Sequence, residues 1–135
     1  MYTNILVPVV FEHQPLIAQA IAIANKLLAD GGKVTVLHVM EEIPSYVATM
    51  VSKEVLTNSL EQARTDLDDI VSKSKNAKAA VVRGHTSRTI LDYSEEIEAD
   101  CIVIASHKPG LEDYFLGSTA ARVVRHAKCS VHVIR

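Results

Sequence analysis

A run of small and polar residues between two regular segments has the composition of an anion-binding loop. It begins as Ala105-Ser106-His107-Lys108-Pro109-Gly110 and ends as Gly117-Ser118-Thr119, just before a helical pattern over residues 120–126. Gly117 has no Cβ, so the backbone can come close to an anion there. The N–H groups of Ser118 and Thr119 would be unpaired donors at a positively polarised helix start. Such helix starts bind phosphate in several nucleotide-binding folds, so these residues predict a phosphate site.

The same residues also allow a purely structural interpretation, in which Ser118 is only the N-cap of the helix and Gly110 only a loop residue. A Walker A loop is excluded, because the spacing differs and no lysine precedes Ser118. His107 has the chemistry of a general base, but the sequence identifies no group that would orient it, which favours packing or contact with phosphate. Two carboxylates in the loop, Glu112 and Asp113, would repel a nucleotide unless they face solvent or hold its metal.

Five apolar runs alternate with helical patterns and must position this loop. The runs cover residues 5–10, 34–39, 79–82, 101–104 and 130–134. Strands that are apolar on both faces are typical of parallel sheets covered by helices. We therefore predict an α/β fold with a single doubly wound, five-stranded parallel sheet, order 3-2-1-4-5, and helices on both faces. Ligands bind such sheets beyond the carboxyl ends of the strands where the order reverses, here between the strands that end at Val10 and Ala105.

Several element boundaries can be predicted from breaker and capping residues. Pro8 is expected at the carboxyl end of the first strand, since it cannot donate a ladder hydrogen bond. Pro15 suits the first turn of a helix that Asp30-Gly31-Gly32 would end. One long helix is expected from about residue 46 or 49 to about residue 74. Thr86 or Ser87 is the expected cap of the next helix.

Length and composition limit the function classes. A chain of 135 residues with 48% hydrophobic and 22% charged residues predicts one globular domain, residues 1–135. A net charge of −2 argues against a nucleic-acid or membrane surface. We find no apolar run long enough to span a membrane and no signal-peptide pattern. Cys101 and Cys129 lie in or beside apolar runs and are expected to be buried and reduced, which fits a cytoplasmic location.

The remaining chemistry-bearing residues favour structural roles. His126, Cys129 and His132 lack the spacing of a metal site, so no metal site is predicted. Arg122, Arg125 and His126 are interpreted as complements to the negative end of the last helix. Arg88, near a helix start, can reach a phosphate, but a solvated arginine is the preferred interpretation.

With these elements placed, the whole chain resembles the universal stress protein family. The resemblance rests on residues 5–10, Leu37-His38-Val39, Gly84 and the ending from Ala105 to Arg135. Nucleotide-binding members carry Gly-x2-Gly-x9-Gly-(Ser/Thr), whereas this chain has Ala105 and Lys108 at the first two glycine positions and a spacer one residue shorter. Ser106-His107-Lys108-Pro109 with a short spacer is similar to the bacterial F and G types, which are understood to bind ATP with a basic residue at the Lys108 position.

The resemblance implies an ATP site, with or without Mg²⁺, and no catalytic residues. The implied nucleotide-binding residues are Pro8, Val9, Val10, Val39, Gly84, Ala105, Ser106, His107, Lys108, Gly117, Ser118 and Thr119. Among them Val39 would lie by the adenine, Gly84 would form a third wall, and the residues from Ala105 onwards would hold the phosphates. One departure concerns the metal, because the family's first strand commonly ends Pro-x-Asp and here it ends Pro8-Val9-Val10.

Three functions follow as alternatives. The first is a regulatory protein that changes state with bound ATP, hydrolyses it slowly at most, and acts on an unknown protein partner. By resemblance it would be a homodimer joined through the C-terminal strand Ser130–Ile134. The second is a module of the same fold that binds no nucleotide and works through protein contacts, which Val10 favours. The third, an adenylate-transferring enzyme, is disfavoured because no paired nucleophile and base is recognisable.

Overall fold

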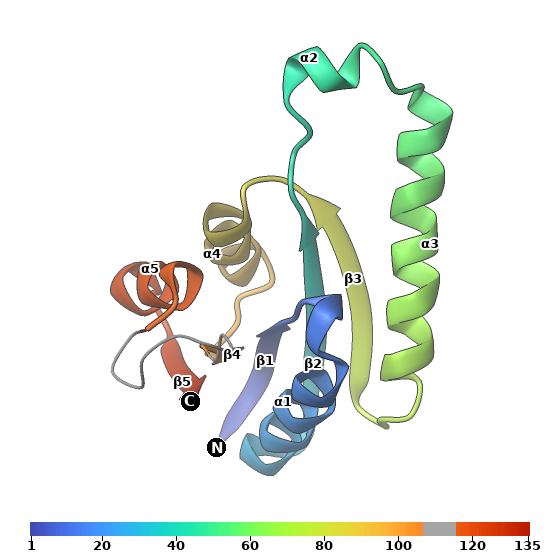
Figure 1. Ribbon diagram of the computed structural model, residues 1–135. Coiled ribbons are helices and arrows are strands. Elements are labelled where there is room, and N and C mark those ends of the chain that lie inside the picture. The colour runs from blue at the N-terminus through green and yellow to red at the C-terminus, as the bar shows by residue number, and fades with distance from the viewer. Residues whose placement is uncertain (107–115) are drawn as a thin grey trace.

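The computed structural model describes residues 1–106 and 116–135 and contains a five-stranded, fully parallel sheet (Figure 1). The strand order is β3-β2-β1-β4-β5, as predicted from the alternation of strands and helices. The strands are β1 (Tyr2–Pro8), β2 (Leu28–Met40), β3 (Ala77–Arg83), β4 (Cys101–Ala105) and β5 (Ser130–Ile134). Pro8 closes β1, the position where its missing N–H costs least.

Helices cover both faces of the sheet, and each face has its own core. On one face α1 (Gln14–Leu27) and α3 (Lys53–Val71) pack over Ile5 and Val7, and on the other α4 (Thr86–Glu96) and α5 (Ser118–His126) pack over Leu6. All three of these β1 side chains are fully buried. This is why an unbroken apolar run forms the central strand: successive side chains point to opposite faces, and both faces are covered.

The first crossover differs from the expected boundaries. A short 3₁₀ turn (Phe11–His13) precedes α1, which ends at Leu27, before Asp30-Gly31-Gly32. The early end has a tertiary cause, because Leu28 already pairs with Tyr2 in the sheet and the register then shifts before Asn4 meets Lys33. Gly31 takes a φ of 80° inside this irregular start of β2, where a glycine avoids backbone strain.

The expected single helix over residues 46/49–74 is instead two helices, so that prediction is wrong at its start. A four-residue helix, α2 (Ser45–Ala48), is separated from α3 by residues 49–52. Ser52 is the N-cap of α3, and its side chain accepts a hydrogen bond from the Val55 N–H at 3.2 Å. A capping serine satisfies a first-turn donor only when its own backbone is extended, which ends helical continuity there.

Two further caps differ from the expected ones. His85, not Thr86 or Ser87, is the N-cap of α4, and its Nδ1 accepts from the Arg88 N–H at 3.5 Å. Gly117 is the N-cap of α5, so Ser118 and Thr119 are its first two helical residues. Their N–H groups are therefore first-turn donors, as the phosphate interpretation requires. None of the helices in the described part of the chain is long and apolar enough to cross a membrane.

Candidate functional site

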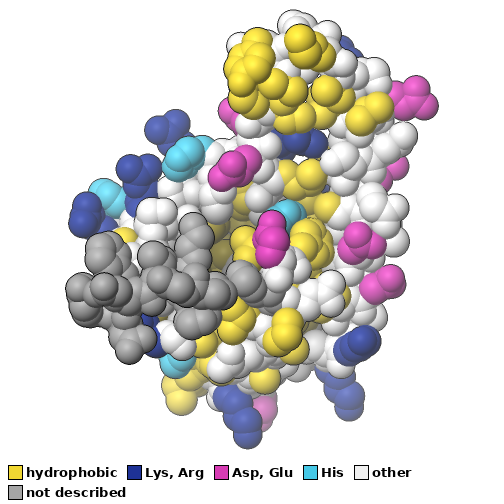
Figure 2. Space-filling view, viewed as in Figure 1, with side chains coloured by type: hydrophobic (Ala, Val, Ile, Leu, Met, Phe, Trp, Pro, Cys, Tyr) yellow, Lys and Arg dark blue, Asp and Glu magenta, His cyan; other side chains and the backbone are white. Residues whose placement is uncertain are grey.

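A cavity of about 600 Å³ lies at the carboxyl edge of the sheet, where the strand order reverses between β1 and β4. Its size falls within the usual range of small-molecule sites. Figure 2 shows the hollow, with apolar side chains and a histidine at its base. Its walls come from the carboxyl ends of β1, β2, β3 and β4 and from the starts of α4 and α5. They include Pro8, Val9, Val10, Leu37, His38, Val39, Met40, Glu41, Arg83, Thr86, Ile104, Ala105 and Thr119.

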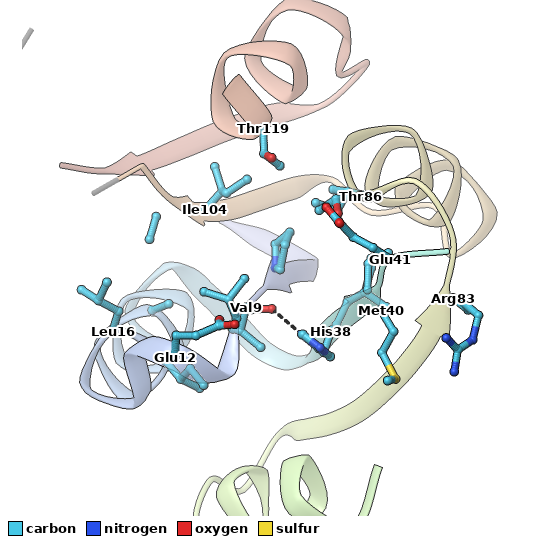
Figure 3. A pocket seen from close by; sticks show the side chains of 18 of the residues that line it. Val9, Glu12, Leu16, His38, Met40, Glu41, Arg83, Thr86, Ile104 and Thr119 are labelled. Carbon is cyan, nitrogen blue, oxygen red and sulfur yellow. Dashed lines mark hydrogen bonds between the residues drawn. The ribbon is translucent and has the colours of Figure 1, made fainter. Parts of the chain in front are cut away.

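The wall that follows β1 is held by its neighbours. The Val9 N–H donates to the Leu37 carbonyl at 2.8 Å, and Nδ1 of His38 lies 3.0 Å from the Val9 carbonyl oxygen (Figure 3). Because a carbonyl can only accept, Nδ1 carries the proton, and Nε2 of a neutral imidazole is then an acceptor. The Phe11 ring packs against this imidazole with 4.5 Å between centroids. Val10, by contrast, is 48% exposed and has extended backbone.

The opposite wall is formed where β4 leads to α5. Ala105 and Thr119 line the cavity there. Ser106 is buried, and its N–H and hydroxyl both donate to the Ile134 carbonyl, at 2.9 and 3.4 Å. The Ser106 side chain is therefore engaged with the end of β5 and does not line the cavity. Gly117 has a φ of −54°, and a Cβ built there would stand 3.6 Å from the Ser106 carbonyl oxygen, an ordinary contact.

A second cavity, of about 460 Å³, lies between the starts of α4 and α5. It shares Glu41, Thr86 and Thr119 with the first cavity, so the two cavities adjoin at these residues. Figure 3 shows Glu41 pointing toward Thr86 at this junction. The other residues that line the second cavity are polar or basic except for one alanine: His85, Ser87, Ser118, Ala121, Arg122 and Arg125.

The structure brings together part of the predicted set. Pro8, Val9, Val10, Val39, Ala105 and Thr119 line the first cavity, and Ser118 and Thr119 line the second. Gly84 lines neither cavity. Its N–H donates to the Met40 carbonyl at 2.9 Å, which ties β3 to β2, and a Cβ there would collide with the Thr89 side chain. His107 and Lys108, like Glu112 and Asp113, lie outside the described residues.

Sequence reasoning did not place His38, Glu41, Thr86, Arg122 or Arg125 in the site by their side chains. A signal existed for Glu41, which follows β2 directly, as Val10 follows β1 closely, and so belongs to the same sheet edge. A weaker signal existed for Arg122 and Arg125, which lie four and seven residues after Ser118 on a single helix. Arg88 is exposed and lines neither cavity.

Metal and cysteine chemistry have little support in the described residues. No group of three histidine, cysteine or acidic side chains among them is placed to hold a metal ion. Both cysteines are free thiols, Cys101 buried and Cys129 partly buried. Burial, with smaller contributions from Cys129 and Asp100, raises the pKa of the Cys101 thiol to about 11, and burial also raises the pKa of Cys129. Neither thiol has the lowered pKa of a cysteine nucleophile.

Comparisons with known proteins match the whole chain. The model of the universal stress protein family matches residues 1–135. The chain is 28% identical to universal stress protein G of Escherichia coli O157:H7 and 30% identical to that of Salmonella typhimurium, each over 100% of both chains.

Solved structures give the same fold. One is the hypothetical protein MJ0577, with a TM-score of 0.81, 24% identity and coverage of 99% of this chain and 96% of that one. Another is the Archaeoglobus fulgidus universal stress protein in complex with dAMP, with a TM-score of 0.66, 19% identity and coverage of 99% and 98%. A third is a universal stress protein in complex with cAMP, with a TM-score of 0.67, 16% identity and coverage of 99% and 97%.

Proposed function

Because the chain belongs to the universal stress protein family, we propose that it is a regulatory protein that binds an adenine nucleotide, ATP in particular, at the carboxyl edge of its sheet. Its contacts with other proteins would then depend on the bound nucleotide. Two structural neighbours in complex with dAMP and cAMP support an adenine nucleotide as the ligand class. Because these neighbours are only 19% and 16% identical to this chain, support for the ligand must come from this chain's own residues.

The observation that carries the proposal is the order of polarity along the two adjoining cavities. The first cavity has apolar walls, including Leu37, Val39 and Ile104, and suits a base. Glu41 and the hydroxyl of Thr86 lie at the junction, where they can bind ribose hydroxyls. Beyond the junction come the first-turn N–H groups of α5 and two arginines, which suit phosphate. Base, sugar and phosphate follow one another in the same order in a nucleotide.

Binding, rather than turnover, suits this arrangement. The Ser87 hydroxyl lies 3.4 Å from His85 Nδ1, but Ser87 is only 4% exposed and the same nitrogen caps α4. A serine so enclosed is poorly placed to attack a phosphate, so the described residues do not support a phosphoryl-serine intermediate, and we infer that any hydrolysis is slow. Regulation also needs a partner. We infer that the protein acts in the cytoplasm, as a homodimer joined through β5, on a protein still to be identified.

The test is calorimetric titration of the purified protein with ATP and adenosine, together with analysis of the small molecules released on denaturation. ATP should bind and adenosine should bind far more weakly. Gly117→Val should abolish ATP binding while the far-ultraviolet circular dichroism stays native, because a Cβ at this position makes only an ordinary contact within the fold. The matched control is Ala18→Val, on the exposed face of α1. ATP affinity unchanged in folded Gly117→Val would contradict phosphate binding at the start of α5.

A protein-interaction module that binds no nucleotide is the second candidate. It is favoured by the apolar side chain of Val10 at the end of β1 and by exposed apolar side chains around α2. Tyr46 is 71% exposed, Met50 83% and Val55 55%, and Figure 2 shows an apolar patch at the top of the molecule where α2 lies. Absence of bound nucleotide and of any heat of ATP binding would select this candidate.

A further inference from the structure

The second cavity has one basic wall, and that wall is a single face of α5. Ser118, Arg122 and Arg125 are separated by four and three residues, the steps that place side chains on the same side of a helix. All three line the second cavity. Thr119, beside Ser118 at the start of the helix, lines both cavities, so this face of α5 begins at the junction and continues along the second cavity.

Neither guanidinium group makes an ion pair in the described part of the chain. The ion pair found there joins Lys128 to Glu95 at 3.3 Å and involves neither arginine. Like charges three or four residues apart on a helix repel each other. Two guanidinium groups without an ion-pair partner beside a cavity favour the binding of an anion. Guanidinium groups match phosphate oxygens in a bidentate geometry.

The wall opposite the arginines also offers hydrogen-bond donors. α4 packs beside α5 (Figure 1) and presents His85, Thr86 and Ser87 to the same cavity. Thr86 and Ser87 are its first two helical residues, so their N–H groups belong to the donors that a helix cannot pair internally. The cavity therefore combines two cationic side chains with donors from two elements.

Glu41 makes the junction less favourable for phosphate than the far side of the second cavity. Its carboxylate lies at the junction, where it would repel a phosphate placed beside it. A polyphosphate that enters through the junction is therefore favoured at the far side, next to the guanidiniums. Arg122 is four residues beyond Ser118, or about 6 Å along the helix axis. The phosphate nearest the ribose would lie at the start of α5, so only the phosphates that follow it would extend as far as Arg122.

We propose that the second cavity binds the terminal phosphates of a nucleoside triphosphate, held by Arg122 and Arg125, and so makes the site selective for triphosphates over monophosphates. This assignment rests on the proposed nucleotide function and extends it to residues that the sequence interpretation had assigned to the negative end of the helix. The start of α5 then meets the first phosphate, and the two arginines meet those that follow.

The experiment compares ATP and AMP in calorimetric titrations of the wild type, Arg122→Gln, Arg125→Gln and the double variant. The wild type should bind ATP at least tenfold more tightly than AMP. Replacing either arginine removes a charge-assisted hydrogen bond to phosphate, so each single variant should bind ATP about tenfold to a hundredfold more weakly, while AMP affinity stays within about twofold. The matched control is Arg88→Gln, an exposed arginine of α4 that lines neither cavity.

Three results would overturn the assignment: equal affinity of the wild type for ATP and AMP, a double variant that binds ATP as the wild type does, or an equal loss in Arg88→Gln. Any of these leaves the proposed function intact as long as nucleotide still binds. Inorganic tripolyphosphate separates the two claims further. If the wild type binds tripolyphosphate and the double variant does not, the cavity is a polyphosphate site even where no adenine nucleotide binds and the proposed function fails.

Discussion

His38 holds the backbone of Val9, because its Nδ1 donates a hydrogen bond to the Val9 carbonyl oxygen over 3.0 Å. The Val9 N–H is held as well, by the Leu37 carbonyl at 2.8 Å. The strand β1 has ended at Pro8, so the first of these bonds extends the link between β1 and β2 by means of a side chain. The wall of the first cavity is thereby fixed before any ligand arrives, which lowers the ordering cost of binding.

Replacing His38 tests this link. His38→Leu removes the donor and leaves the Val9 carbonyl short of a partner, so the free energy of unfolding should fall by about 1 kcal/mol and ATP affinity should fall with it. His38→Asn is the matched control, because its amide nitrogen stands about where Nδ1 stood. Denaturant unfolding and calorimetry give the two readouts. Equal losses in both variants would mean that ring packing against Phe11, and not the hydrogen bond, holds the wall.

The sheet and the first cavity were predictable from the sequence because each depends on local patterns. Runs such as residues 5–10 and 101–104 are apolar on both faces, and only a covered parallel sheet accommodates them. Once the order 3-2-1-4-5 is set, the carboxyl ends of β1 and β4 must meet at the reversal of strand order. That is why Pro8, Val10 and Ala105 lie together on one cavity.

The second cavity could not be predicted in the same way, since it depends on how closely α4 approaches α5. The sequence places Arg122 and Arg125 on a helix, but it does not give the distance from that helix to Thr86. The arginines were interpreted as complements to the negative end of the helix because that end is the one electrostatic partner that the sequence makes visible. The break before Ser52 was missed for a related reason. Apolar spacing continues across the break, whereas the Ser52 side chain caps the start of a new helix there.

Assembly through β5 can be tested by placing charge on the strand. β5 pairs only with β4 in the described chain and so has a free edge, where unprotected strands readily pair. We expect two copies to join antiparallel across a two-fold axis. Ser130 and His132 are exposed, and replacing both with Asp would oppose carboxylates across that axis. The double variant should sediment as a monomer with a native circular dichroism spectrum.

This design is sharper than deletion of residues 131–135, because Ile134 is buried and its carbonyl accepts from Ser106. Deletion would therefore damage the fold as well as the edge. The control is Thr57→Asp with Asn58→Asp, two exposed positions on α3. A wild type that is already monomeric, or a charged variant that remains dimeric, would exclude assembly through this edge.

Asp100 makes stability depend on acid pH. Burial opposes its charged form, but hydrogen bonds outweigh burial and hold the pKa of this carboxyl below its ordinary value. The donors are the Thr3 N–H at 2.8 Å, the Thr3 hydroxyl at 3.1 Å and the Asn4 N–H at 3.0 Å. A carboxyl with a lowered folded pKa stabilises the fold above its unfolded pKa of about 4, and this contribution is lost as the pH falls through the folded value.

Asp100→Asn should therefore be less stable than the wild type at pH 7, and the difference should shrink as the pH is lowered from about 4. Urea unfolding at a series of pH values measures it. Asp92→Asn, an exposed position on α4, is the control and should show no such trend. A stability difference that stays constant down to pH 2 would show that Asp100 acts through the shape of its side chain and not through its charge.

We expect the side chain of Val10 to decide whether Mg²⁺ strengthens nucleotide binding. It lines the first cavity, is 48% exposed and offers neither charge nor hydrogen bond to a ligand. We therefore expect the wild type to bind ATP almost equally well with Mg²⁺ and with a chelator. Val10→Asp loses little buried apolar surface and places a carboxylate where the cavity meets solvent. It should gain about tenfold to a hundredfold in ATP affinity, and only when Mg²⁺ is present, because without the metal its charge repels the phosphates.

Val10→Asn separates charge from shape, because it has the size of aspartate and a weaker affinity for a divalent cation. It should gain nothing from Mg²⁺. A wild type that needs Mg²⁺ would contradict the prediction and point to another carboxylate on the cavity. Glu41 and Glu12 both line it, and Glu41→Gln and Glu12→Gln would then identify which one holds the metal. Glu41 lies at the junction with the second cavity, whereas Glu12 lines only the first cavity. A metal that bridges ribose and phosphate would therefore require Glu41.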